Sequence, residues 1–129
     1  MELFFSERFN CSSCHGGFDF TDYSFKNNGL YEEYLDEGRY RLTKIESDKF
    51  LFKTPSLRNI AMTFPYMHDG SMMSLEEVVD HYSTGGAKNK HKSQEIKIID
   101  MNAIEKQQLI AFLKTLTDNQ FILNPLNYE

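Results

Sequence analysis

The sequence predicts an all-α domain built from few helices and long loops. Segments 74–83 and 102–116 carry apolar residues at helical spacing, and each begins with a polar capping pair. Residues 16–53 keep no regular period and are rich in Gly, Asn, Asp and Tyr. No two segments alternate in a way that indicates a strand pair. Because a long irregular stretch in a compact domain needs a packing partner, we expect these loops to surround something large.

The first half of the chain is expected to hold short helices between loops. Apolar residues at near-helical spacing predict a helix over residues 2–14, which two glycines then end. One short turn is expected near 30–36. A further helix is predicted over 56–62, because Pro55 suits a first helical turn. Residues 64–70, FPYMHDG, form a loop.

Two later helices are better defined. Ser74 and Glu77 form a capping box for the first, and Asn102 and Glu105 can form the same pair for the second. The apolar stripes consist of Leu75, Val78, Val79 and Tyr82 in the first helix and of Leu109, Phe112, Leu113 and Leu116 in the second. Residues 118–129 follow as a C-terminal tail that must dock or fray.

Length and charge narrow the function classes. The 129 residues, of which 40% are hydrophobic, suit one domain over 1–129 with a core of its own or a core wrapped around a large flat cofactor. The net charge of -5 argues against nucleic acid as the main partner. The sequence contains no run of 18 apolar residues, so it predicts no membrane-spanning helix. The first ten residues lack a signal-peptide pattern and Cys11 follows at once, so we expect a domain excised from a larger protein.

The stretch FNCSSCHGG at 9–17 holds the only two cysteines, Cys11 and Cys14, followed directly by His15. A structural zinc ion needs four ligands, and the adjacent Cys14 and His15 would struggle to close on one tetrahedral ion. A disulfide would leave His15 without a role. A thioredoxin-like redox motif should follow a strand, and none is predicted here. Zinc and a disulfide nevertheless remain as alternatives.

A covalently attached haem uses every residue of this motif. Two thiols three positions apart on one helical turn can both add to the vinyl groups of one haem, and the next residue then presents its imidazole to the iron. The sequence therefore favours haem c attached through Cys11 and Cys14, with His15 as the proximal iron ligand. Because attachment needs dedicated maturation machinery, recombinant material made without that machinery is expected to lack the haem.

Residues 52–86, FKTPSLRNIAMTFPYMHDGSMMSLEEVVDHYSTGG, resemble the C-terminal haem domain of bacterial di-haem cytochrome c peroxidases and their MauG-type relatives. Residues 109–117, LIAFLKTLT, resemble the closing helix of cytochrome c folds, and the resemblance extends over residues 3–117. It implies a cytochrome c-like fold, a periplasmic location and electron transfer coupled to peroxide reduction. It also implies a second, N-terminal domain with another CxxCH motif and the peroxide-binding haem.

This chain has one CxxCH motif and no Trp, a residue that family members often place between the two haems. The resemblance therefore implies that the chain carries the electron-relay haem, with a second haem domain and a small electron-donor protein as partners. On its own it would transfer electrons without catalysing peroxide reduction. The alternatives are a stand-alone mono-haem cytochrome c that carries electrons, and a haem-free structural or zinc-binding module.

The sixth iron ligand has several candidates. Aligned on PYMHDG, the position of the axial methionine in many peroxidases holds Tyr82, and MauG-type members have a tyrosine there. The resemblance thus favours Tyr82 as the second metal ligand, with Met67 as the alternative. Tyrosinate would lower the potential and methionine would raise it. The alternative interpretation is that Tyr82 is a buried aromatic residue on the apolar stripe of its helix. The further candidates are Met62, Met72, Met73, His68 and His81.

Three other residues are expected near the cofactor. His68 resembles a family residue close to the haem and would orient a ligand or contact a propionate. Arg58 suits a propionate because a guanidinium matches a carboxylate. Pro55 can place a backbone carbonyl near the Nδ1–H of His15, which would raise the basicity of that ligand. Arg39 and Arg41 have no expected role beyond propionate or interface contacts.

Overall fold

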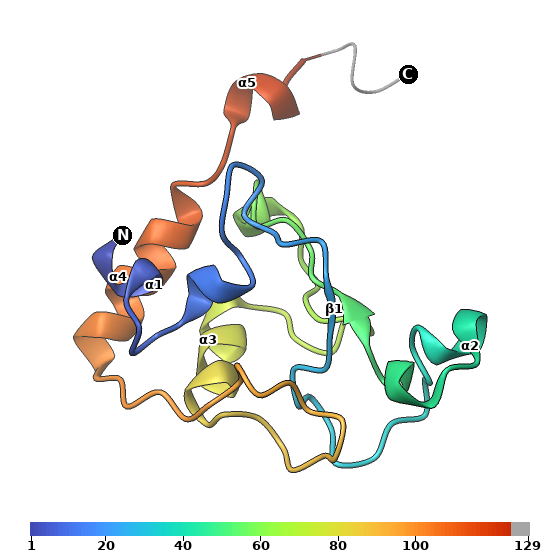
Figure 1. The fold of residues 1–129 in the computed structure, drawn as a ribbon. Coiled ribbons are helices and arrows are strands. Elements are labelled where there is room, and N and C mark those ends of the chain that lie inside the picture. Colours follow the sequence, from blue (N-terminus) through green and yellow to red (C-terminus); the bar gives the residue numbers. More distant parts are fainter. Residues whose placement is uncertain (125–129) are drawn as a thin grey trace.

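Helices supply most of the regular structure in the computed structural model, which describes residues 1–124 (Figure 1). The helices α1 (Glu2–Phe5), α3 (Leu75–Ser83) and α4 (Ala103–Lys114) form the packed part of the domain. The short helices α2 (Tyr40–Thr43) and α5 (Asn119–Ile122) lie at its edges (Figure 1). The predicted mostly helical domain with long loops is confirmed.

The expectation of no strand pair was wrong. Two strands, β1 (Phe25–Lys26) and β2 (Phe52–Lys53), pair antiparallel, with Phe25 opposite Lys53 and Lys26 opposite Phe52. Each strand has only two residues, so neither shows the alternation from which a strand is predicted. The pair closes the long loop between residues 27 and 51 at its base.

The predicted helix over 2–14 was also wrong, because it is two short pieces. α1 ends at Phe5, and the 3-10 helix η1 (Cys11–Ser13) begins after Asn10, whose φ of 53° is left-handed. The hydroxyl of Ser6 donates to the carbonyl of Leu3 at 2.7 Å and accepts from the Phe9 amide at 3.3 Å. This serine competes with helical hydrogen bonding and turns the chain.

The segment after Pro55 also departs from expectation. Instead of a helix over 56–62, only the 3-10 helix η3 (Ile60–Met62) forms, because Asn59 adopts a left-handed φ of 60°. Nothing in the sequence predicted α2 or the 3-10 helix η2 (Glu46–Asp48), which shape the loop ahead of β2. Each has four residues or fewer, which is too short for a helical period to be read.

The two well-defined helices are confirmed. Ser74 accepts from the Glu77 amide at 3.2 Å, and Asn102 accepts from the Glu105 amide at 3.0 Å, each with the reciprocal bond of a capping box. Lys106 on α4 pairs with Asp80 on α3 at 2.6 Å. The buried core lies where these helices meet α1, and consists of Phe4, Phe9, Tyr66, Leu75, Val79, Leu109, Ile110 and Leu113.

The C-terminal tail predicted for 118–129 is ordered in part. Asp118 caps α5 by accepting from the Phe121 amide at 3.0 Å, and its own amide donates to the Asn59 side chain at 2.7 Å. The tail therefore docks beside η3 through this contact. Residues 125–129 lie outside the described part of the chain.

Candidate functional site

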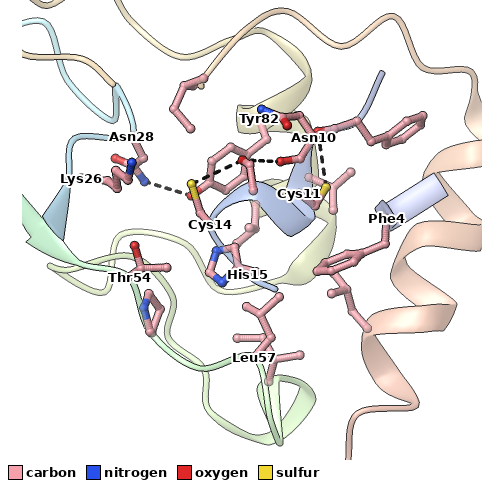
Figure 2. Close-up of a pocket in the computed structure, with 18 of the residues that line it drawn as sticks. Phe4, Asn10, Cys11, Cys14, His15, Lys26, Asn28, Thr54, Leu57 and Tyr82 are labelled. Carbon is pink, nitrogen blue, oxygen red and sulfur yellow. Dashed lines mark hydrogen bonds between the residues drawn. The ribbon is translucent and has the colours of Figure 1, made fainter. Parts of the chain in front are cut away.

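A cavity of about 770 Å³ opens between η1, α3 and the segments 52–58 and 95–101. Its volume falls in the range of cofactor and ligand sites in proteins. All seven site residues predicted from the sequence line it, namely Cys11, Cys14, His15, Pro55, Arg58, His68 and Tyr82. Figure 2 shows Cys14 and Tyr82 converging on the same space, with His15 beside them. The fold therefore brings together residues that are up to 71 positions apart (82 − 11) in the sequence.

The CxxCH motif forms a single tight turn on one wall of this cavity. The amides of Cys14 and His15 both donate to the carbonyl of Cys11, at 3.4 and 3.0 Å. The carbonyl of Cys14 accepts from the Asp22 amide at 2.8 Å, which holds the end of the turn against the next loop. This arrangement presents both sulfur atoms and the imidazole to one side.

Both cysteines are free thiols, so the disulfide alternative is not supported. Burial raises the pKa of Cys11 to about 11 and also raises the pKa of Cys14. The hydrogen bond between the Ser13 hydroxyl and the Cys14 sulfur acts in the opposite direction and lowers the pKa of Cys14. Both thiols are therefore mainly protonated at neutral pH.

The imidazole of His15 is held in one orientation by the loop that follows it. Its Nδ1 lies 3.1 Å from the carbonyl oxygen of Phe20. Burial lowers the pKa of His15, and the carbonyls of Phe20 and Pro55 oppose that shift. The ring is thus a neutral imidazole whose Nδ1–H donates to a carbonyl, which leaves the Nε2 lone pair available for a metal. The contact of the Phe20 carbonyl with His15 was not predicted, because nothing in the neighbouring sequence indicates which backbone carbonyl will face the imidazole.

Tyr82 and Met67, the two leading candidates for the sixth ligand, lie side by side in the cavity. The side-chain nitrogen of Asn28 is 3.3 Å from the Met67 sulfur and 3.5 Å from the Tyr82 hydroxyl. Burial raises the pKa of Tyr82, and the hydrogen bond from Asn28 acts in the opposite direction. Asn28 was missed from the sequence, because one asparagine in an Asn-rich loop carries no distinguishing signal.

Four of the other candidates for this position lie outside the cavity. Met62 and Met73 are 58% and 61% exposed, and neither they nor Met72 and His81 line the cavity. The Nε2 of His81 is instead engaged with the carbonyl of Asn28 at 3.1 Å. Of the sequence-predicted candidates, Tyr82, Met67 and His68 therefore line the cavity, and the Asn28 amide contacts the first two.

His68 belongs to an aromatic cluster at the cavity rim. Its ring stacks on Phe52 with centroids 3.6 Å apart, and Tyr34 lies 6.0 Å away on the same cluster. The neighbouring Asp69 accepts a hydrogen bond from Tyr31 at 2.6 Å. These contacts hold the loop at 64–70 against the residues around it and keep His68 in the lining of the cavity.

Arg58 lies exposed at another part of the rim. Its guanidinium donates to the carbonyl of Phe18, sits 4.2 Å above the Phe18 ring and lies 3.8 Å from Asp19. Arg39 pairs with Asp48, and Arg41 lies 3.8 Å from Asp36. Neither Arg39 nor Arg41 lines the cavity. Arg58 and Arg8 do, so these two arginines are the ones available there to a cofactor carboxylate.

The described residues hold neither a structural metal site nor a membrane-spanning helix. Within residues 1–124, no group of three or more His, Cys, Asp or Glu side chains is arranged to hold a metal ion, so a structural zinc site is not supported. None of the described helices has the length and apolarity needed to cross a bilayer. The donor set instead fits a c-type haem, because two thiols and a neutral imidazole line one wall of a cavity with many apolar residues.

Comparison with known proteins places this chain in a family. No family model matches the chain. The methylamine utilization protein MauG of Methylorubrum extorquens is 42% identical over 113 residues, which cover 87% of this chain and 32% of that protein. The cytochrome-c peroxidase IdrP1 of a Pseudomonas species is 44% identical over 90 residues, covering 70% of this chain and 24% of that protein. The chain is homologous to one haem domain of the MauG and di-haem cytochrome c peroxidase family.

A solved structure of the family agrees in fold. The crystal structure of a MauG-like protein associated with microbial copper homeostasis superposes with a TM-score of 0.90 at 40% identity, over 96% of this chain and 47% of that one. The chain spans about a third of the length of the two curated MauG proteins that it matches. Members of this family carry c-type haem.

Proposed function

We propose that the chain is the c-type haem-binding electron-transfer domain of a MauG-like or di-haem peroxidase oxidoreductase. One observation carries the proposal: the CxxCH turn and the Tyr82–Met67 pair line the same cavity. Homology to one haem domain of this family supports it. In this proposal the bound haem supplies one-electron transfer, and the residues of the chain hold it and set its environment.

The residues divide this work by position. The thiols of Cys11 and Cys14 anchor the cofactor, and the imidazole of His15, oriented by the Phe20 carbonyl, ligates the iron. Tyr82 is the proposed sixth ligand, with Met67 as its competitor. Arg58 and His68 at the rim, together with the carbonyl of Pro55, would contact the cofactor edge or its ligand.

The position of the chain within a larger protein is part of the proposal. We place it as the C-terminal domain, which receives electrons from a small donor protein in the periplasm and passes them to a second haem domain. That it covers about a third of the length of two curated MauG proteins supports this placement within a larger protein. A natural gene that encodes no second CxxCH motif would instead identify a stand-alone mono-haem carrier.

Haem loading is the first test. The chain is co-expressed with cytochrome c maturation proteins in an oxidising compartment, and covalent haem is measured by the pyridine haemochrome spectrum and by intact mass. We expect one haem per chain, and loss of covalent attachment in Cys11→Ser together with Cys14→Ser. Ser12→Ala, inside the same motif, should load normally. A chain that stays haem-free under these conditions contradicts the proposal.

The ligand assignment is tested on the same material. Absorption spectra and redox titrations compare the parent with Tyr82→Phe and with Met67→Leu. A low potential and a spectrum that changes in Tyr82→Phe but not in Met67→Leu support Tyr82 as ligand. A high potential with a sulfur-to-iron band that disappears in Met67→Leu assigns the site to methionine.

A further inference from the structure

Asn28 contacts both leading candidates for the sixth ligand. Its Nδ2 donates to the Met67 sulfur at 3.3 Å and reaches the Tyr82 hydroxyl oxygen at 3.5 Å. A primary amide has two N–H donors, so one can point to each acceptor. Figure 2 shows the Asn28 side chain directed toward Tyr82. No other described residue donates a side-chain hydrogen bond to both Met67 and Tyr82.

The orientation of this amide is set by the opposite end of the same group. Asn28 Oδ1 accepts from the Leu30 amide at 3.2 Å, which identifies that atom as the oxygen and directs the NH₂ into the cavity. The backbone carbonyl of Asn28 accepts from His81 Nε2 at 3.1 Å. Asn28 is therefore tied to α3 at the residue next to Tyr82.

A second contact fixes the segment against the end of α3. Gly86 has a φ of +68°, and a Cβ there would lie 2.8 Å from the carbonyl oxygen of Asn28. The Ala87 amide donates to the Gly29 carbonyl at 2.7 Å. The backbone that carries Asn28 is thus packed and hydrogen-bonded against the end of the helix that carries Tyr82, whereas Met67 lies on the separate loop at 64–70.

We propose that Asn28 is a positioning residue that holds the Met67 thioether away from the iron and leaves the position to Tyr82. This inference rests on the proposed haem function. An N–H···S bond occupies a lone pair of Met67, and the long, flexible methionine side chain needs such a restraint to stay in one place. A hydrogen bond to a metal-bound phenolate oxygen is charge-assisted and stronger, so the same amide favours Tyr82 as ligand.

The decisive variant removes the donor but keeps the turn. In Asn28→Ser the hydroxyl can still accept from the amide two residues on, but it is too short to reach Met67. We expect a sulfur-to-iron absorption band to appear and the reduction potential to rise in the haem-loaded protein. Met67→Leu in the Asn28→Ser background should abolish the new band. Asn28→Asp, which keeps the acceptor and lacks the donor, should give the same band.

The matched control is Asn89→Ser. Asn89 Oδ1 accepts from the His91 amide at 2.8 Å in the same kind of turn, but Asn89 does not line the cavity. Its replacement should leave the spectrum and the potential unchanged. An unchanged spectrum in both Asn28 variants would overturn the inference, as would a band that persists after Met67→Leu.

Failure of the inference can be told apart from failure of the proposed function. A parent protein that loads haem but already shows the sulfur-to-iron band has Met67 as its ligand, which overturns the role of Asn28 and leaves haem binding intact. A parent that takes up no covalent haem overturns both.

Discussion

The Nζ atom of Lys26 lies 2.6 Å from the Oε1 atom of Glu95, and this ion pair joins β1 to the segment at 95–101 across one wall of the cavity. The two residues are far apart in the sequence, and both side chains are partly exposed. Lys26 lowers the pKa of Glu95, and the Glu95 carboxylate raises the pKa of Lys26. The pair therefore stabilises the contact between β1 and the segment at 95–101 chiefly while Glu95 is ionised.

The first prediction concerns pH. Because the pKa of Glu95 lies below its ordinary value of 4.5 in the folded chain, the stabilisation is present above pH 4.5 and is lost as the pH falls through the folded value. A pH titration followed by NMR should give a midpoint for Glu95 below 4.5. Lys26→Met should move that midpoint upward and cost at most about 1 kcal/mol of unfolding free energy, because the pair is partly solvated. An unchanged midpoint would contradict the pairing.

The second prediction concerns thiol reactivity in the haem-free chain. Because burial raises the pKa of Cys11 from 9.0 to about 11, its thiolate population at pH 8 falls by a factor of about 100. Alkylation of Cys11 by iodoacetamide, followed by mass spectrometry of peptides, should be slower by about that factor than in the urea-unfolded chain. Equal rates in the folded and unfolded chains would show that Cys11 is not buried in solution.

The third prediction concerns the aromatic core between α1 and α4. Phe4 is 1% exposed, and its ring lies 5.1 Å from Phe112. Phe4→Ala should lower the free energy of unfolding by about 3–5 kcal/mol, because it leaves a cavity in the core. The adjacent Phe5 is 51% exposed, and Phe5→Ala is the matched control with an expected loss of less than about 1 kcal/mol. Urea denaturation measures the free energy of unfolding of both variants. Similar losses in the two variants would show that Phe4 is no more important to the core than Phe5.

The fourth prediction ranks two features of α4. Asn102 caps the helix with its side chain, and its replacement by alanine should cost about 1 kcal/mol. The Lys106–Asp80 pair is exposed on the Asp80 side, so its coupling energy in a double-mutant cycle should be smaller, about 0.2–1 kcal/mol. A coupling energy larger than the loss at Asn102 would contradict this ranking.

The elements predicted correctly are those with strong local signals. The capping boxes at Ser74 and Asn102 and the apolar stripes behind them depend on residues within one or two turns of each other, so the sequence alone reveals them. The break at Ser6 and the left-handed Asn59 were missed because each depends on how the chain turns to pack. The β1–β2 pair was missed because its partners are brought together only by the fold.

The site shows the same division. The spacing of Cys11, Cys14 and His15 is local, since a single turn presents all three, so the sequence by itself determined the attachment motif and the cofactor class that it predicts. Only the tertiary structure decided which distant groups face that motif. It placed Met67 beside Tyr82, set the Phe20 carbonyl on His15 and directed the Asn28 amide between the two candidate ligands. Such contacts depend on the path of the backbone through long loops. The residues next to a short polar residue in a loop therefore do not predict which partner the fold brings to it.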